Sequence, residues 1–431
     1  MGQVSRSGKA GFARLTLTTI AALTPSQHEV VIHDARLSEP DYDGDWDLVG
    51  FTGMTCEMPH VYQMAGEFRK RGKTVAIGGY HASALPEEIG KHADIVVVGE
   101  AEGLWQRILF ELVNGGAKHT IYQNDKFVEM RNMAIPRRGL LNRDMYVVPT
   151  TIQATRGCPF DCDYCAVTRF FGRNYRCRPV EDVVAEIRGE KDKQLMFFDD
   201  NLIANSKYAK ELFRALIPLG VTWGAQASFT LTRDAELMDL YAKAGGRFVF
   251  IGLESISAET LRSIGKGFNR PEEYAVGIRQ LQRRGITVMG SFMFGLDGDD
   301  LGVFKRTVDF VNATKIDVAL YNILTPLPGT RLYEKMDLQG RIHDRDWSHY
   351  DACHSVIHPQ GMTSDELQNG WYWANRETYK LSSMLRRAFR PDLGWKRRLT
   401  AAYSYFRKAY RYCPPPLHPE KYSNPPNPLC T

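Results

Sequence analysis

The sequence predicts an α/β protein with two parallel-sheet regions followed by a helical extension. Short β-branched apolar runs alternate with segments of helical spacing up to about residue 110, and the alternation returns at residue 147. This pattern is typical of parallel strands whose connecting helices cover the sheet. Glycines follow the early strands and polar residues follow the later ones. Both features indicate ligand crevices at the carboxyl ends of the strands.

The composition indicates a large globular enzyme. The chain has 431 residues, enough for two or three domains, with 43% hydrophobic and 24% charged residues. Eight cysteines, three of them clustered, suit a reducing cytoplasm rather than a disulfide scaffold. There is neither an apolar run long enough for a membrane span nor a signal-peptide core, so we expect a cytoplasmic protein. The net charge of +5 is small for this length and does not indicate nucleic acid as a partner.

Residues 1–115 form the first predicted domain, a doubly wound, Rossmann-like parallel sheet. Its loops at 52–55 and 78–81 follow strands and contain glycine, so we expect them to line the ligand crevice. The chain opens with the helical run Leu15–Leu23, so the usual first strand is missing or atypical. The predicted strands are Glu29–His33, Leu48–Thr52, Val75–Ile77 and Ile95–Val98, and Pro59–Arg71 is a predicted helix.

A connector over 116–146 leads to a second predicted domain, residues 147–335, which contains six β/α units. Its first strand-like run, Val147–Ala154, directly precedes a cysteine cluster. The other predicted strands are Gln194–Phe198, Thr222–Ala227, Phe248–Leu253, Thr287–Phe294 and Val318–Leu324. The predicted helices between them are Val180–Arg188, Lys207–Leu216, Ala235–Ala244, Pro271–Arg284 and Val303–Ala313.

The cysteine cluster has the spacing C-x3-C-x2-C, formed by Cys158, Cys162 and Cys165. Soft thiolates favour iron–sulfur clusters, zinc or Cu(I), whereas a structural zinc site normally takes four protein ligands. Three ligands on one loop leave one iron of a four-iron cluster free for another ligand. A zinc site completed by a distant residue, or three buried thiols, are the alternatives at this point. Cys177 lies twelve residues further on and is interpreted as structural or pocket-lining, not as a ligand.

Polar residues follow several strands of the second domain, where apolar residues would pack better. Together they predict a lined cavity at one edge of the sheet. Helix capping is the alternative role for the acidic residues among them. The residues are Asp199, Asp200, Gln226, Ser228, Glu254 and Ser291.

The cysteine motif, Tyr164 within it and the strands up to residue 330 resemble the radical S-adenosylmethionine (SAM) enzymes. The resemblance implies a partial (β/α)6 barrel and a [4Fe-4S] cluster whose open iron chelates SAM. Reductive cleavage of SAM would then give a radical that attacks an unactivated carbon of a small-molecule substrate. The electron would come from a donor such as flavodoxin or ferredoxin. By the same resemblance, the acidic pair Asp199 and Asp200 lies at the SAM amino group and Glu254 at the ribose. Tyr164, Gln226, Ser228 and Ser291 are the other expected contacts of SAM.

The first domain resembles the cobalamin (B12)-binding domain that precedes the barrel in one subgroup of these enzymes. The matching segments are 49–52, 78–81 and 98–102. Cobalamin and methyl transfer are therefore implied, although the D-x-H-x-x-G motif that supplies a histidine ligand to cobalt is absent. A sheet that only braces a cobalamin-free radical enzyme, and a non-catalytic electron-transfer protein, are the alternatives. The implied cobalamin contacts are Thr52, Gly53, Gly78, Gly79 and His81.

The C-terminal third contains a predicted helical extension, residues 336–412, and a proline-rich tail, residues 413–431. Within the extension, His349, Tyr350 and His354 are candidates to touch substrate, with packing as the alternative. The stretch 386–411 is basic and aromatic. It is either a peripheral membrane or acidic-partner surface, or a helix that packs its aromatic residues on the barrel.

Overall fold

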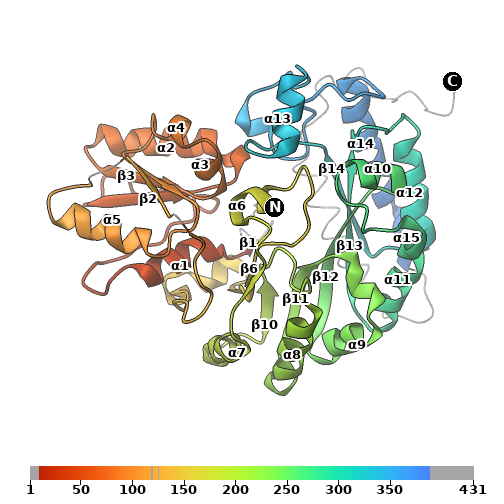
Figure 1. The fold of residues 1–431 in the computed structure, drawn as a ribbon, viewed down its shortest axis with the longest axis horizontal. Coiled ribbons are helices and arrows are strands. Elements are labelled where there is room, and N and C mark those ends of the chain that lie inside the picture. The colour runs from red at the N-terminus through yellow and green to blue at the C-terminus, as the bar shows by residue number, and fades with distance from the viewer. Residues whose placement is uncertain (1–8, 118–119, 125, 389–431) are drawn as a thin grey trace.

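The computed structural model describes residues 9–117, 120–124 and 126–388, and it confirms the predicted α/β fold class. Figure 1 shows a small sheet with its helices beside a larger, curved sheet, with helix α6 (Ala166–Phe171) at the seam between them. Across the described residues, no helix combines the length and apolarity needed to span a bilayer. The tail at 413–431 and residues 389–411 of the basic stretch lie outside the described residues.

The small sheet has four parallel strands in the order β2 (Leu48–Thr52), β3 (Thr74–Gly78), β4 (Ile95–Val98) and β5 (Ile121–Gln123). Alternate residues of its strands point to two separate cores, because successive side chains of a strand face opposite sides. One core packs against α2 (Met58–Lys70), and the other packs against α5 (Leu104–Val113). The doubly wound arrangement is therefore confirmed. The same region contains α1 (Leu15–Leu23), α3 (Tyr80–Ala84), α4 (Pro86–Ile89) and the short 3-10 helix η1 (Thr55–Glu57).

The N-terminal region differs from the expectation in its outer strands. Residues 29–33 form no strand, and the prediction made there is wrong. Val31 is 60% exposed in that irregular segment, so its apolar run has no sheet to join. The last strand of the small sheet, β5, lies beyond residue 115, within the predicted connector. At the start of the chain, β1 (Ala10–Phe12) pairs in parallel with β6 (Tyr146–Val148) of the larger domain.

The larger sheet has six parallel strands, which confirms the six predicted β/α units. The predicted run 147–154 is divided into β6 and β7 (Thr150–Ile152), and the two-residue β8 (Thr155–Arg156) follows it. Pro149 separates the first two, because proline cannot donate a ladder hydrogen bond. The strand order is β14 (Val318–Ile323), β13 (Thr287–Phe294), β12 (Gly246–Glu254), β11 (Thr222–Ala227), β10 (Gln194–Phe197) and β7.

Helices cover the outer face of this sheet (Figure 1), and their apolar sides form one continuous core with it. Alternate side chains of β10–β13 point into that core; they include tryptophan, phenylalanine and aliphatic residues and are almost fully buried. The opposite face of the sheet therefore faces the barrel interior. The covering helices are α7 (Val180–Gly189), α8 (Ser206–Leu216), α9 (Ala235–Lys243), α10 (Ala258–Ser263), α11 (Pro271–Arg283) and α12 (Val303–Thr314).

The C-terminal extension packs against the last strand and closes that side of the barrel. The buried Trp371 of α14 (Ser364–Tyr379) donates a hydrogen bond to the carbonyl of Tyr321 in β14 at 2.9 Å. The side chain of Thr363 and that of Glu366 form a capping box at the start of α14, which fixes where the helix begins. The extension also contains α13 (Arg331–Leu338), the 3-10 helix η6 (Trp347–His349) and α15 (Leu381–Ala388).

Candidate functional site

The cysteine loop runs from β8 to α6 and is held at several points. Gly157 opens it with φ +83°, and an added Cβ would lie 2.4 Å from the carbonyl oxygen of Asn174, so glycine is required there. Arg331 of α13 donates to the carboxylate of Asp161 at 2.8 Å and to that of Asp163 at 2.9 Å. These bonds keep the loop in one conformation before any ligand binds.

The three thiols on this loop fit a [4Fe-4S] cluster in their chemistry. Burial raises the pKa of Cys162 to about 12, and it also raises the pKa values of Cys158 and Cys165. The side-chain amide of Asn201 lies 3.9 Å from the sulfur of Cys158 and favours its thiolate form. Backbone N–H groups after Cys165 favour the thiolate there. Among the described residues, no three metal-ligating side chains are already gathered around one point, so the loop would bring its thiols together as the cluster binds. Iron would then replace three protons on these soft ligands.

The two aspartates after β10 have different environments. Oδ1 of Asp199 accepts hydrogen bonds from the backbone N–H groups of Ala154 and Thr155 and from the Thr155 hydroxyl, so it holds the turn between β7 and β8. Asp200 instead accepts the N–H of Gly157 at 2.9 Å, directly before the first cysteine. Burial raises the pKa of Asp200 to about 6 and that of Asp199 to about 7. The geometry therefore favours Asp200 as the carboxylate available to SAM.

Glu254, Lys266 and Tyr164 form a buried network that joins the end of β12 to the cysteine loop. The Lys266 ammonium donates to Glu254 Oε1 at 2.6 Å and lies 3.0 Å from the Tyr164 hydroxyl. Tyr164 donates to the same Oε1 at 3.1 Å. Both contacts use Oε1, so among the described residues Oε2 is the oxygen left for a ligand. Burial alone would lower the pKa of Lys266, but Glu254 and then Cys162 raise it, so the group stays cationic.

Helix capping does not account for these carboxylates. Asn205 accepts the N–H of Tyr208 and caps α8, and Ser257 accepts the N–H of Thr260 and caps α10. Glu254 also has a φ of +63°, which is unfavourable for a residue with a Cβ. Strain of this kind is typical of functional sites.

The remaining predicted SAM contacts lie at different depths in the barrel. Gln226 is exposed and donates to the carbonyl of Asp200 at 3.1 Å, so it lies next to the acidic pair. The backbone N–H of Ser228 donates to Asn201 at 3.0 Å. Ser291 is buried, and its hydroxyl accepts a hydrogen bond from Asn322 at 2.8 Å. Gln226 and Ser228 thus lie beside the residues that border the cysteines, whereas Ser291 is paired across β13 and β14.

The crevice loops of the small sheet meet at the carboxyl ends of β2 and β3. Thr52 and Gly78 are register partners. Gly79 has a φ of +103°, and an added Cβ would lie 2.7 Å from the Thr52 hydroxyl oxygen. A Cβ on Gly53 would meet Glu57 and Val61 at 3.4 Å. Glycine is therefore required at position 79, because a side chain there would clash with Thr52 and the positive φ disfavours a Cβ.

These loops face the barrel. The Tyr80 hydroxyl donates to the carbonyl of Pro328 at 2.6 Å, and the Tyr80 ring lies 6.4 Å from that of Phe170 in α6. A ligand on the crevice of the small sheet would therefore also lie beside the cysteine loop.

His81 has a packing role instead of an exposed position in the crevice. Its side chain is 0% exposed, with Nε2 3.2 Å from the Tyr62 hydroxyl and Nδ1 3.3 Å from the Thr55 hydroxyl. Its ring meets that of Trp347 edge-on at 5.2 Å. Burial lowers the pKa of His81, so the imidazole is neutral. The structure therefore gives His81 packing contacts within the small domain, and its predicted contact with cobalamin stays a prediction.

A buried ion network, which the sequence analysis did not predict, joins the two domains next to the cysteines. Glu100, in the loop after β4, binds Arg156 of β8 at 2.6 Å and Arg176 of β9 (Arg176–Cys177) at 2.9 Å. Glu102 binds the same Arg156 at 2.6 Å. Since Arg156 lies two residues before Cys158, this network attaches the small sheet directly to the cysteine loop. We define these four residues as the interdomain clamp.

Other candidates from the sequence lie apart from this site. His349 and the Tyr350 hydroxyl both bond to Asp344, and His354 pairs with Asp351, so all three stabilise the extension itself. Cys177 lies in β9 opposite Thr155 and is half-buried.

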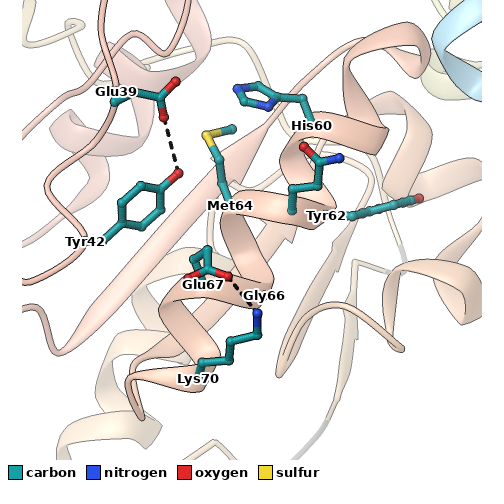
Figure 2. Close-up of a pocket in the computed structure, with 9 residues that line it drawn as sticks. Glu39, Tyr42, His60, Tyr62, Met64, Gly66, Glu67 and Lys70 are labelled. Carbon is teal, nitrogen blue, oxygen red and sulfur yellow. Dashed lines mark hydrogen bonds and ion pairs between the residues drawn. The ribbon is translucent and has the colours of Figure 1, made fainter.

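A separate surface hollow of about 510 Å3 lies on α2 (Figure 2). It contains none of the predicted site residues. Its lining includes Glu39, Tyr42, His60 and Lys70.

Comparison with known proteins agrees with this geometry. The radical SAM superfamily model matches residues 152–311, and the B12 binding domain model matches residues 14–109. Bacteriochlorophyllide d C-12(1)-methyltransferase of Chlorobaculum tepidum is 30% identical over 394 residues, which cover 88% of this chain and 86% of that protein. The chain belongs to the radical SAM superfamily. It is an enzyme of that superfamily with an N-terminal B12 binding domain, as the resemblance predicted.

Two further relatives extend the comparison. The bacteriochlorophyllide d C-8(2)-methyltransferase of the same organism is 33% identical over 362 residues, which cover 80% of each chain. The structure of the radical SAM methyltransferase TsrM from Kitasatospora setae, with tryptophan substrate and a SAM analog bound, has a TM-score of 0.68. It is 16% identical, and the match covers 92% of this chain and 97% of that one. The two proteins share their fold over nearly their whole length.

Proposed function

We propose that this chain is a cobalamin-dependent radical SAM methyltransferase that methylates an unactivated carbon of a small-molecule substrate. The observation that carries the proposal is that the small sheet contacts the cysteine loop and its surroundings, through Tyr80 at the end of β3 and through the interdomain clamp. A corrin ring at the carboxyl ends of β2 and β3 would therefore lie near a SAM molecule bound beside the cysteines. The curated relatives described above are methyltransferases, which supports the same reaction.

Three groups of residues would hold the cofactors. Cys158, Cys162 and Cys165 would ligate the [4Fe-4S] cluster, and Asp200 and Glu254 would bind SAM. The main chain at Gly78 and Gly79, with Thr52, would support the corrin ring. When bound, the cluster supplies the electron that cleaves SAM, and cobalamin supplies the methyl group.

The tasks of the protein are to fix geometry and exclude water. Asp200 is bonded to Gly157, and Glu254 to Tyr164 within the cysteine motif, so a SAM molecule held by both carboxylates is oriented by the loop that binds the cluster. The Lys266 ammonium pairs with the Glu254 carboxylate and helps to hold it in place. Flavodoxin or ferredoxin would deliver the electron.

Bound cobalamin should lack a protein histidine ligand. The D-x-H-x-x-G motif is absent, and both ring nitrogens of His81 have partners within the domain. In the electron paramagnetic resonance spectrum of the Co(II) form, we expect no nitrogen hyperfine splitting from an axial ligand.

Cobalt content tests the proposal, with a matched pair of glycine variants. Gly79→Ala places a methyl group 2.7 Å from Thr52, whereas Gly72→Ala has the same kind of positive φ but nothing within 4 Å. Protein purified from cells supplied with cobalamin should contain cobalt in the wild type and in Gly72→Ala, and much less in Gly79→Ala. Iron content should be equal in all three. If the wild type contained no cobalt under conditions that load a related methyltransferase, cobalamin dependence would be contradicted. A cobalamin-free radical reaction would then be the remaining function.

A further inference from the structure

The inward face of the barrel sheet carries apolar side chains that the core leaves uncovered. Along β10–β14, one set of alternate residues is buried against the outer helices, and most large apolar residues of the other set stay partly exposed. In the register of the sheet, Phe250 lies beside Gln226 on one side and Met289 on the other. The uncovered apolar side chains are Met196, Phe248, Phe250, Met289 and Leu320.

A glycine confirms which side chains share this face and where they lie. A Cβ on Gly224 would be 2.8 Å from a ring carbon of Phe248 and 3.1 Å from the sulfur of Met196. Both side chains therefore lie across the bare main chain of β11 and form a continuous apolar floor.

Gly252 lies one step higher, towards the carboxyl ends of the strands. A Cβ added to Gly252 would lie 2.3 Å from the Glu254 carboxylate and 2.7 Å from the Lys266 ammonium. The apolar floor thus reaches up to the charged network beside the cysteine loop.

The polar groups on this face already have partners. Gln226 donates to the carbonyl of Asp200, and Asn322 donates to Ser291. Glu254 is paired with Lys266. The surface that remains for a ligand is therefore mostly hydrocarbon and thioether. At the rim, Phe198 is 43% exposed, with the ring of Phe12 5.6 Å from it.

We propose that the substrate is a large, predominantly apolar ring system that inserts its hydrocarbon edge into the barrel; this rests on the proposed function. Aromatic rings and methionine thioethers give broad, adaptable contact with an apolar ligand. Among the described residues, the charged groups at the top of this face, Glu254 and Lys266, already pair with each other. A charged substituent would therefore stay outside the barrel, because an unpaired charge is costly to desolvate. The reacting carbon would then lie beneath the cysteine loop, at the level of Gly252.

Equilibrium binding to cluster-loaded protein with SAM, without reductant, tests this proposal. The probes are methyl pheophorbide and a pentacyclic triterpene, two apolar ring systems of different shape, and tryptophan as a small zwitterion. At least one apolar probe should bind more tightly than tryptophan. Met289→Glu should weaken its binding by at least about tenfold, since a carboxylate must be desolvated. Met289→Leu should keep the affinity. Val276→Glu, on the outer face of α11 at 50% exposure, is the matched control and should also keep it.

Tighter binding of tryptophan than of both apolar probes, or apolar binding that Met289→Glu leaves unchanged, would overturn the assignment. If Met289→Glu lowers the iron content, Leu320→Gln gives the same test with a neutral polar group on the same face. The assay involves no turnover, so failure of SAM cleavage would count against the proposed function alone. Loss of apolar binding with SAM cleavage intact would count against the substrate class alone.

Discussion

Replacing Glu254 by glutamine separates its two roles, as the partner of Lys266 and as the expected contact of SAM. The side chains of the pair are only 8% and 11% exposed. Removing one charge of a buried pair leaves the other uncompensated and typically costs about 3–5 kcal/mol of folding free energy. Losing a charge-assisted bond to the SAM ribose would cost roughly 1.5–3 kcal/mol of binding free energy. We therefore expect lower thermal stability together with a ten- to hundredfold weaker affinity for SAM.

The double variant Glu254→Gln with Lys266→Met distinguishes these effects. Removing both charges should recover most of the stability, because apolar replacements of buried pairs are often neutral. The affinity for SAM should remain weak. Equilibrium binding of SAM to anaerobic, cluster-loaded protein measures the second effect, and iron analysis confirms that the cluster is retained. An unchanged SAM affinity in both variants, with full iron, would show that Glu254 has only a structural role.

Two further predictions concern stability. Glu100→Gln should destabilise the fold by about 3 kcal/mol, because the buried Arg156 and the partly buried Arg176 of the interdomain clamp lose their common carboxylate. The same variant should also speed amide hydrogen exchange around Arg156. The control is Glu236→Gln, which breaks an exposed pair with Arg214 and should change both stability and exchange little. Equal effects of the two variants would contradict the role of the interdomain clamp. Burial raises the pKa of Asp299 from 3.8 to about 7. Between these two values the folded protein keeps a proton on Asp299 that the unfolded chain releases. The free energy of unfolding therefore falls as pH rises from about 4 to 7. Asp299→Asn should therefore gain thermal stability relative to the wild type between pH 5 and 8, and a pH-independent difference would show that Asp299 does not titrate in this range.

Local patterns in the sequence were enough to predict most of the architecture. The spacing of Cys158, Cys162 and Cys165 and the strand periods of the barrel depend only on neighbouring residues, so they can be read along the chain. Proline at 149 was visible as well, but its effect in dividing one apolar run into two strands was not predicted. Residues 29–33 show where local patterns fail to predict structure. A β-branched run forms a strand only where a neighbouring strand is placed to pair with it.

The missed parts of the site depend on contacts between distant residues. Lys266 lies twelve residues after Glu254 in a Gly-Lys-Gly segment, and only the fold brings it to Tyr164. Glu100 and Arg156 are 56 positions apart, and their pairing needs the two domains to be placed together. The roles of Asp199 and Asp200 could not be separated by sequence, since the difference is which backbone N–H each carboxylate accepts.

Reductive cleavage of SAM by anaerobically reconstituted protein tests the central claim most directly. With dithionite as the electron source, the wild type should form 5′-deoxyadenosine, and Cys162→Ala should lose both the brown absorbance of the cluster and this product. Cys177→Ala, in the neighbouring strand β9, should retain both. Near-full iron content in Cys162→Ala, or no 5′-deoxyadenosine from wild-type protein with a complete cluster, would contradict the radical SAM mechanism assigned to this loop.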